Sequence, residues 1–204
     1  MGYYGDRILP RIIDSSLGSK NTGPLRTRVC DGLAGDVIEI GFGSGTNIPF
    51  YPADVYSVAA IEPADLGWQL AAERVRESTI TIERSGLDGH YLPFPDESFD
   101  SALSTWTLCT IVDVESALLE VRRVLRPAGT FHFLEHGLAP DQRVRRWQQR
   151  LAPVHRLVLG GCKVTLPIAD LIAGAGFKLT EIDCFYEPIG PKYAAAMYLG
   201  VAVK

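Results

Sequence analysis

The segment EIGFGSGTN, residues 39–47, follows the β-branched run DVIEI at 36–40 and places glycines at 41, 43 and 45. An apolar run that ends in a glycine-rich turn is typical of a buried strand leading into a ligand-binding loop, because glycine allows tight turning and close approach of a ligand. The nicotinamide fingerprint G-x-G-x-x-G would need glycine at 46, where this chain has Thr46. An acid, Glu62, stands 21 residues after Gly41, where it could accept two hydrogen bonds from a ribose diol. These features alone fit either NAD or S-adenosylmethionine.

The length and composition indicate one globular domain. The chain has 204 residues, of which 47% are hydrophobic and 22% charged, and its net charge of -4 argues against a nucleic-acid partner. The opening residues MGYYGDRILPRIID are too charged for a signal peptide, so a cytoplasmic location is expected. Four cysteines, at 30, 109, 162 and 184, form no C-x-x-C pair, which argues against a zinc knuckle and favours buried or site-lining thiols.

Working outward from the glycine turn, strands and helices alternate. Strands are predicted at 36–40, 55–62, 79–83, 98–105 and 129–136, and helices at 64–78 and 114–126, the second with Asp113 as its N-cap. This alternation predicts a doubly wound α/β fold with a parallel sheet covered on both sides. Two extended runs at 178–187 and 192–204 have no helix between them, so they must form an antiparallel hairpin at the end of the sheet.

The pentapeptide HFLEH, His132 to His136, matches a zinc-peptidase pattern that requires a helix. Here it ends a predicted strand, which would hold the two histidines about 13 Å apart. Zinc-bound nitrogens must lie within about 3.5 Å of each other, so we expect no zinc on this pair and predict no metal site.

Residues 35–135 resemble the class I S-adenosylmethionine-dependent methyltransferases, particularly the type 11 group related to quinone C-methyltransferases. The resemblance runs through VIEIGFGSGTN, IEP, LDGHYLPFPDESFDSALS and LLEVRRVLRPAGTFHFLEH. It implies a Rossmann-like, mostly parallel seven-stranded sheet, S-adenosyl-L-methionine as cofactor and S-adenosyl-L-homocysteine as product. Ala128 departs from the family pattern, which usually has glycine there, and the sequence around Asp88 is unusual.

The resemblance also implies roles for individual residues. The glycine loop would hold the methionine part of the cofactor with Glu39 behind it, Glu62 the ribose, and Asp88 the adenine amino group. Residues 104–106 would face the cofactor's amino group and the methyl. The implied cofactor-binding residues are Glu39, Gly41, Gly43, Gly45, Asn47, Glu62, Pro63, Leu87, Asp88, Gly89, Ser104, Thr105 and Trp106.

The second half is similar to the thiol S-methyltransferases of the methyltransferase-like family, and more loosely to bacterial phospholipid N-methyltransferases, through TLCTI, FLEH, WQQRLAPVHRLVLGGCKVT and GVAVK. The resemblance implies a small apolar acceptor, with a thiol favoured. A thiol would benefit from a neighbouring imidazole, so His136 and His155 are the candidate catalytic residues. The alternatives are a phospholipid or amine N-methyltransferase, a quinone C-methyltransferase, a nicotinamide-dependent oxidoreductase and a non-catalytic protein that binds S-adenosylmethionine.

Two further segments receive a prediction. Residues 1–24 are expected to form a helical lid over the methyltransferase domain at 25–204. The basic helix from Arg143 to Arg150 could make weak contact with an anionic membrane surface, although such a face is usually just solvated. The expected partner is otherwise a small-molecule acceptor, and the sequence predicts no oligomeric state.

Overall fold

The computed structural model describes residues 22–86, 91–158, 161–188 and 190–204. The predicted lid at 1–24 therefore lies outside the described residues except for its last three. Leu87, Asp88 and Gly89, which were assigned to the cofactor, also lie outside them.

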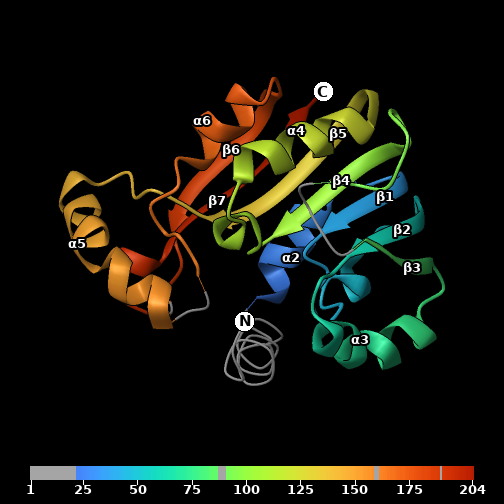
Figure 1. Cartoon of the computed structure of the whole chain (residues 1–204), viewed down its shortest axis with the longest axis horizontal. Coiled ribbons are helices and arrows are strands. Elements are labelled where there is room, and N and C mark those ends of the chain that lie inside the picture. Colours follow the sequence, from blue (N-terminus) through green and yellow to red (C-terminus); the bar gives the residue numbers. More distant parts are fainter. Residues whose placement is uncertain (1–21, 87–90, 159–160, 189) are drawn as a thin grey trace.

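A single mixed sheet forms the centre of the molecule (Figure 1). Its strands follow the order β3-β2-β1-β4-β5-β7-β6. β1 pairs in parallel with β2 and β4, and β4 in parallel with β5, whereas β7 runs antiparallel between β5 and β6. The predicted seven-stranded, mostly parallel sheet with a terminal antiparallel hairpin is confirmed. The strands are β1 Gly35–Ile40, β2 Val55–Ile61, β3 Thr81–Gly86, β4 Phe99–Thr105, β5 Leu125–His136, β6 Lys178–Tyr186 and β7 Ala196–Val203.

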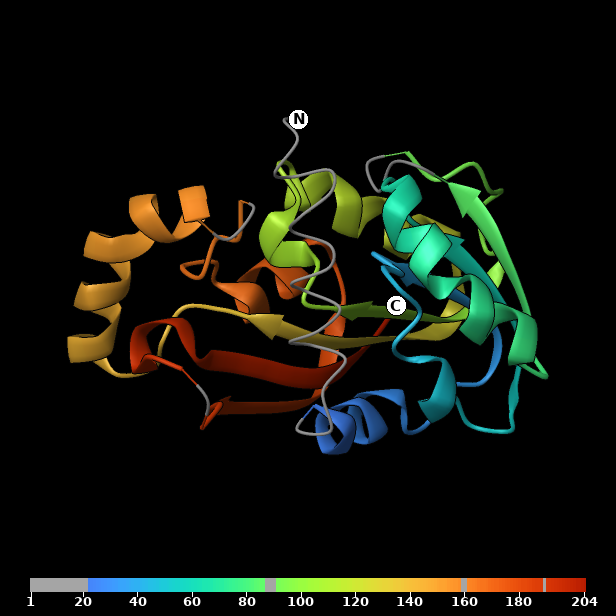
Figure 2. The same ribbon diagram turned by 90° about the horizontal axis from the view of Figure 1, so that it is seen from below.

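Helices cover both faces of the sheet (Figure 2). The helices are α2 Gly23–Cys30, α3 Asp65–Glu77, α4 Val114–Val124, α5 Gln142–Val158 and α6 Ile168–Gly174, with short 3-10 turns η2 Ile48–Phe50, η3 Leu108–Thr110 and η4 Lys192–Ala194. Side chains of α4 and α6 share one core cluster with Phe131 and Phe133 of β5. Those of α2 and α3 share the other with Leu103 and Leu134. The doubly wound arrangement follows, since the strands present apolar side chains to both layers.

Helix α4 shows how closely the local sequence specifies its element. Its apolar residues at helical spacing face the core, and the Asp113 carboxylate accepts a hydrogen bond from the Ser116 amide at 3.1 Å. This is the predicted N-cap. The helix ends at Val124, two residues earlier than predicted, because Leu125 already pairs with Phe99 as the start of β5.

Several strand boundaries differ from the predicted ones because backbone pairing overrides the local sequence pattern. β5 begins four residues before the predicted start and includes Ala128, whose φ of 63° is left-handed. β3 spans 81–86 rather than 79–83, in register with β2 from Ser57 to Ile61. The segment 192–194 is a 3-10 turn, so β7 begins only at Ala196.

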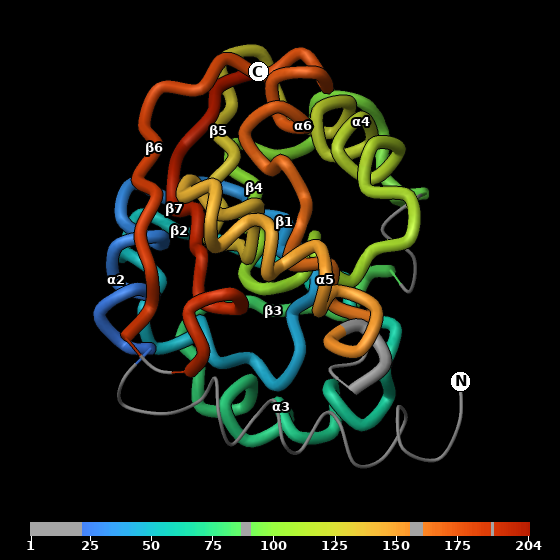
Figure 3. The backbone as a smooth tube through the Cα atoms, turned by 90° about the vertical axis from the view of Figure 1, so that its left-hand side faces the viewer, coloured from blue at the N-terminus to red at the C-terminus, as the bar shows by residue number. Residues whose placement is uncertain are grey.

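Helix α5 stands apart from the two layers (Figure 1). Viewed from that side, it lies in front of the carboxyl ends of β4 and β5 (Figure 3). Ligands of doubly wound sheets bind at this edge. Among the described residues, no helix combines the length and the apolar character that crossing a membrane requires.

Candidate cofactor and acceptor site

The glycine turn after β1 is shaped for close approach of a ligand. Gly41, Gly43 and Gly45 have φ values of 73°, 58° and 72°, a conformation that favours glycine. A side chain at Gly45 would meet Ile48 at 2.8 Å, and one at Gly41 would collide with Thr107. At Gly43, by contrast, an added Cβ would meet no atom nearer than 3.9 Å. The turn is thus packed against the protein at two glycines and open at the middle one, as a cofactor cradle requires.

Glu62 supports this turn from the end of β2. Its Oε2 accepts a hydrogen bond from the Gly43 amide and its Oε1 one from the Ala64 amide, each at 2.7 Å. Burial raises the pKa of Glu62, while these two backbone hydrogen bonds oppose the rise. Each carboxylate oxygen keeps a lone pair, so a ribose diol could still bind. Pro63, beside it, is exposed.

Glu39 is buried beneath the glycine turn and holds it through hydrogen bonds. Asn47 Nδ2 donates to Glu39 Oε1 at 2.7 Å and to Thr105 Oγ1 at 3.0 Å, and Tyr51 donates to Glu39 Oε2. Arg26 Nη1 donates to Asn47 Oδ1 at 2.5 Å. Burial raises the pKa of Glu39 to about 7, although the hydrogen bonds from Tyr51 and Asn47 oppose it. This network joins α2, β1, the turn and β4. Sequence reasoning missed Arg26 and Tyr51, since neither belongs to a motif.

Trp106 occupies a conformation that its surroundings must enforce. Its φ is 51°, its amide donates to Leu134 O at 2.8 Å, and the Arg26 guanidinium lies 4.8 Å from its ring centre. A left-handed conformation costs a non-glycine residue roughly 1–2 kcal/mol. The indole Nε1 is buried, and none of the described residues offers it a hydrogen-bond acceptor. Buried donors in native proteins normally have an acceptor, so this orphan fits a ligand oxygen.

Glu135 is a third residue that sequence reasoning missed. It is fully buried, and its Oε1 accepts hydrogen bonds from Ser104 Oγ at 2.7 Å, the Thr107 amide at 3.0 Å and the Leu108 amide at 3.1 Å. Burial raises its pKa to about 7 against the effect of these bonds. Glu135 therefore fixes the segment after β4 that carries the predicted residues 104–106. The strand pattern correctly set it apart from the histidines of HFLEH, but nothing in the sequence indicated this anchoring role.

The two histidines of HFLEH have separate surroundings on β5. His132 Nδ1 lies 2.9 Å from Val29 O and its Nε2 lies 3.2 Å from Thr130 Oγ1, so both ring nitrogens have protein partners. The predicted strand is confirmed. That His132 and His136 hold no zinc ion between them stays a prediction.

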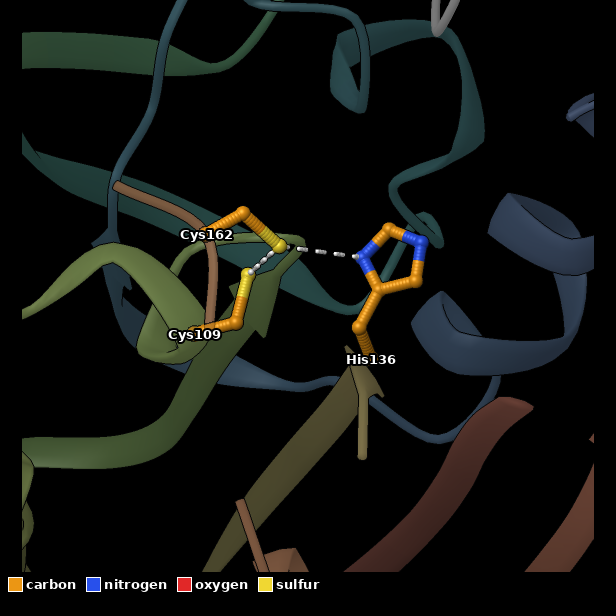
Figure 4. Close-up of side chains that lie close together, drawn as sticks. All are labelled: Cys109, His136 and Cys162. Atoms are coloured by element: carbon orange, nitrogen blue, oxygen red, sulfur yellow. Dashed lines mark hydrogen bonds between the residues drawn. The ribbon is translucent and has the colours of Figure 1, made fainter. Parts of the chain in front are cut away.

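His136 and His155, the predicted catalytic residues, are both close to Cys162. His136 Nδ1 lies 3.9 Å from Cys162 Sγ, which lies 3.3 Å from Cys109 Sγ (Figure 4). The hydrogen bond between Cys162 and Cys109 lowers the pKa of Cys162, with smaller contributions from His136 and His155, and the pKa of Cys109 is raised in turn. Burial acts to lower the pKa of His136, but its hydrogen bond with Cys162 and the charge there raise it. Sequence reasoning had treated these cysteines only as buried or site-lining thiols.

Helix α5, which carries His155, lies beside this group of cysteines and histidines. Gln148 is buried and links the helix to the chain after β5, accepting from the Ala139 amide at 2.7 Å and donating to Gly137 O and Val164 O at 3.0 Å. The neighbouring Trp147 is 56% exposed, with the Arg150 guanidinium 5.7 Å from its ring centre. Weak contact of the helix Arg143–Arg150 with a membrane surface stays a prediction.

Comparison with known proteins matches residues 38–133 to the family described as a methyltransferase domain. The human thiol S-methyltransferase TMT1A is 30% identical over 174 residues, which cover 82% of this chain and 70% of the human protein. A phosphatidylethanolamine N-methyltransferase from Cereibacter sphaeroides is 29% identical over 129 residues, covering 61% of this chain and 63% of that protein. A solved structure from Thermotoga maritima, described as a methyltransferase dependent on S-adenosylmethionine and a possible histamine N-methyltransferase, superimposes with a TM-score of 0.71 at 20% identity over 100% of both chains.

Proposed function

Since the chain belongs to the class I S-adenosylmethionine-dependent methyltransferases, we propose that it transfers the methyl group to the sulfur of a small apolar thiol. The observation that carries this choice of acceptor is the similarity to the thiol S-methyltransferase TMT1A, which extends over 82% of the chain and so includes the acceptor side. The similarity to the phospholipid enzyme covers only 61%. We therefore favour a thiol over an amine as the methyl acceptor.

Different residues described above would bind different parts of the cofactor. Gly43 leaves room for the methionine part, Glu62 would accept from the ribose hydroxyls, and the Trp106 indole would donate to a cofactor oxygen. S-adenosylmethionine supplies a methyl group that is already activated on a sulfonium, so the protein mainly aligns the acceptor and excludes water. Glu39 and Glu135 contribute by fixing the turn and the segment after β4.

The acceptor side would be the region where β4 and β5 end. Cys109 follows Trp106 by three residues, and its sulfur lies 3.9 Å from the Trp106 carbonyl oxygen, so the cysteine–histidine cluster adjoins the proposed methyl side. His136 and His155 are proposed as acceptor-side residues, with His136 directly after Glu135. That either histidine acts as a general base remains a prediction.

A panel of matched acceptors tests the proposal. The wild-type enzyme is incubated with methyl-labelled cofactor and a thiol, an amine or an alcohol that share one apolar carbon skeleton, and the methylated product is identified by mass spectrometry. We expect methyl thioether as the main product. Preference for the amine would replace this proposal with the N-methyltransferase function. Tight binding of S-adenosylhomocysteine without turnover of any acceptor in the panel would instead favour the non-catalytic alternative.

A further inference from the structure

We propose that Cys109, His136 and Cys162 bind one Zn²⁺ ion, with a fourth coordination position left for the sulfur of the acceptor. The three donor atoms, two Sγ and one imidazole nitrogen, all lie within 4.8 Å of one another. Figure 4 shows the side chains converging on one point from three separate segments. The part that concerns the acceptor rests on the proposed thiol methylation, whereas the metal site does not.

The distances suit a tetrahedral ion. With metal–sulfur bonds of about 2.3 Å and metal–nitrogen bonds of about 2.0 to 2.1 Å, two sulfurs lie roughly 3.8 Å apart, and a sulfur and a nitrogen roughly 3.6 Å. The corresponding distances here are 3.3 Å between the cysteine sulfurs and 3.9 Å from Cys162 Sγ to His136 Nδ1. Small side-chain rotations would close both differences. A disulfide would require a separation of about 2.05 Å, well below the 3.3 Å between the two sulfurs.

The backbone around the ligands is held independently of their side chains. The Lys163 amide donates to Cys109 O at 2.8 Å, and its ammonium group donates to Ile111 O at 3.0 Å and Val112 O at 2.9 Å. These bonds tie the Cys162 segment to the turn that carries Cys109. Gln148, through Gly137 O and Val164 O, ties the same segment to the end of β5. A site supported in this way holds its ligands in place before the ion arrives.

The donor set selects the metal. Thiolate and imidazole ligands suit zinc, whereas magnesium and calcium prefer oxygen. Three protein ligands with an open position are typical of catalytic zinc sites, and structural sites usually use four. Both cysteines are buried and His136 is half-buried, so the histidine side is the more accessible one.

A thiol that binds the metal at the open position, next to the methyl group of the cofactor, would be activated directly. A coordinated thiol is deprotonated outright, releasing its proton to solvent. The thiolate sulfur then forms a bond to the methyl carbon while the bond from that carbon to the sulfonium sulfur breaks. The products are a methyl thioether and S-adenosylhomocysteine, and no oxidant or reductant is needed.

Cobalt titration tests the metal site without measuring activity. Metal-free wild-type protein, with its thiols reduced, is titrated with Co²⁺ and followed by absorption spectroscopy. We expect one equivalent to bind with thiolate-to-cobalt charge-transfer bands and the visible bands of tetrahedral cobalt, and one equivalent of Zn²⁺ to displace it. Absence of thiolate-ligated cobalt from the reduced wild-type protein would overturn the proposal, and so would finding that the protein forms only a Cys109–Cys162 disulfide.

Cysteine variants assign the ligands. Cys109→Ser and Cys162→Ser should each weaken Co²⁺ binding by at least about tenfold, whereas Cys184→Ser, at an exposed thiol outside the cluster, should bind like wild type. Circular dichroism and S-adenosylhomocysteine binding show whether each variant is folded. A Cys184→Ser variant that loses the bands while the two cluster variants keep them would overturn the assignment.

A small thiol added to the cobalt protein tests the fourth position. We expect the thiol to strengthen and shift the charge-transfer bands, and the alcohol of the same skeleton to leave them unchanged. A response to neither would overturn the binding of the acceptor sulfur to the metal, while turnover in the acceptor panel would show separately whether thiols are methylated at all.

Discussion

Glu62 offers the sharpest test of the cofactor side, because one carboxylate is assigned to both the glycine turn and the ribose. We consider Glu62→Gln, which keeps the size of the side chain but removes its charge and one of its two acceptor oxygens. The Gly43 and Ala64 amides each donate to a different oxygen at 2.7 Å, so the variant's new NH₂ group must face one of these N–H groups. The turn would lose one charge-assisted hydrogen bond, and the ribose would lose a charged acceptor.

The expected loss of affinity follows from these contacts. A hydrogen bond to a charged group contributes about 1.5 to 3 kcal/mol. At about 1.4 kcal/mol for each factor of ten, Glu62→Gln should weaken S-adenosylhomocysteine binding by about 10- to 150-fold. Glu62 is only 6% exposed, so solvent screening does not reduce this range much.

Isothermal titration calorimetry with S-adenosylhomocysteine measures the effect, and thermal unfolding confirms that the variant is folded. Asp65→Asn is the matched control: it makes the same chemical change three residues away, at a carboxylate that is 82% exposed and pairs with Arg84. Its affinity should stay within about twofold of wild type. A folded Glu62→Gln protein that binds as tightly as Asp65→Asn would refute the reasoning.

Three further outcomes concern stability. Glu135→Leu leaves three donors without their acceptor and should lower the free energy of unfolding in urea by about 3 kcal/mol or more. Glu135→Gln keeps an acceptor oxygen and should lower it by less than half of that amount. Equal losses in the two variants would contradict the anchoring role. Ala128→Gly relieves a left-handed φ of 63° at an exposed position and should raise the free energy of unfolding by about 0.5 to 1 kcal/mol; a lower melting temperature would contradict this. The hydrogen bond from Arg123 lowers the pKa of Glu120 below 4.5 in the folded protein. The ion pair with Arg123 therefore contributes its full stability above the ordinary pKa of the carboxyl group, and this contribution is lost as the pH falls through the lowered pKa. Glu120→Gln should lower the free energy of unfolding by about 1 kcal/mol at pH 7 and by little in strong acid. A loss of stability that does not depend on pH would contradict this prediction.

The parallel character of the sheet and its terminal hairpin followed from short-range patterns, whereas the spatial order of the strands was not predicted. Alternating apolar runs and amphipathic helices fixed a parallel sheet, and the two terminal runs without a helix between them fixed the antiparallel hairpin. Strand ends were less predictable, because pairing decides them: Leu125 joins β5 through Phe99, which lies far from it in sequence.

The cofactor loop was also visible in the sequence, since three glycines in one short turn carry their own conformational requirement. The side chains beneath it were not. Arg26, Tyr51 and Glu135 bind partners that lie on other elements, and no local pattern records those partners.

The cysteine–histidine cluster belongs to the tertiary structure alone. By itself the sequence determined that HFLEH is a strand and that its two histidines are too far apart to share an ion, and on that basis it predicted no metal. Only the fold brings Cys109 and Cys162 to His136, because the ends of β4 and β5 are neighbours in a parallel sheet and the chain after α5 returns to the same edge. Ligands separated by 26 and 27 residues leave no periodic or short-motif signal, so the meeting of these three side chains is a consequence of sheet topology.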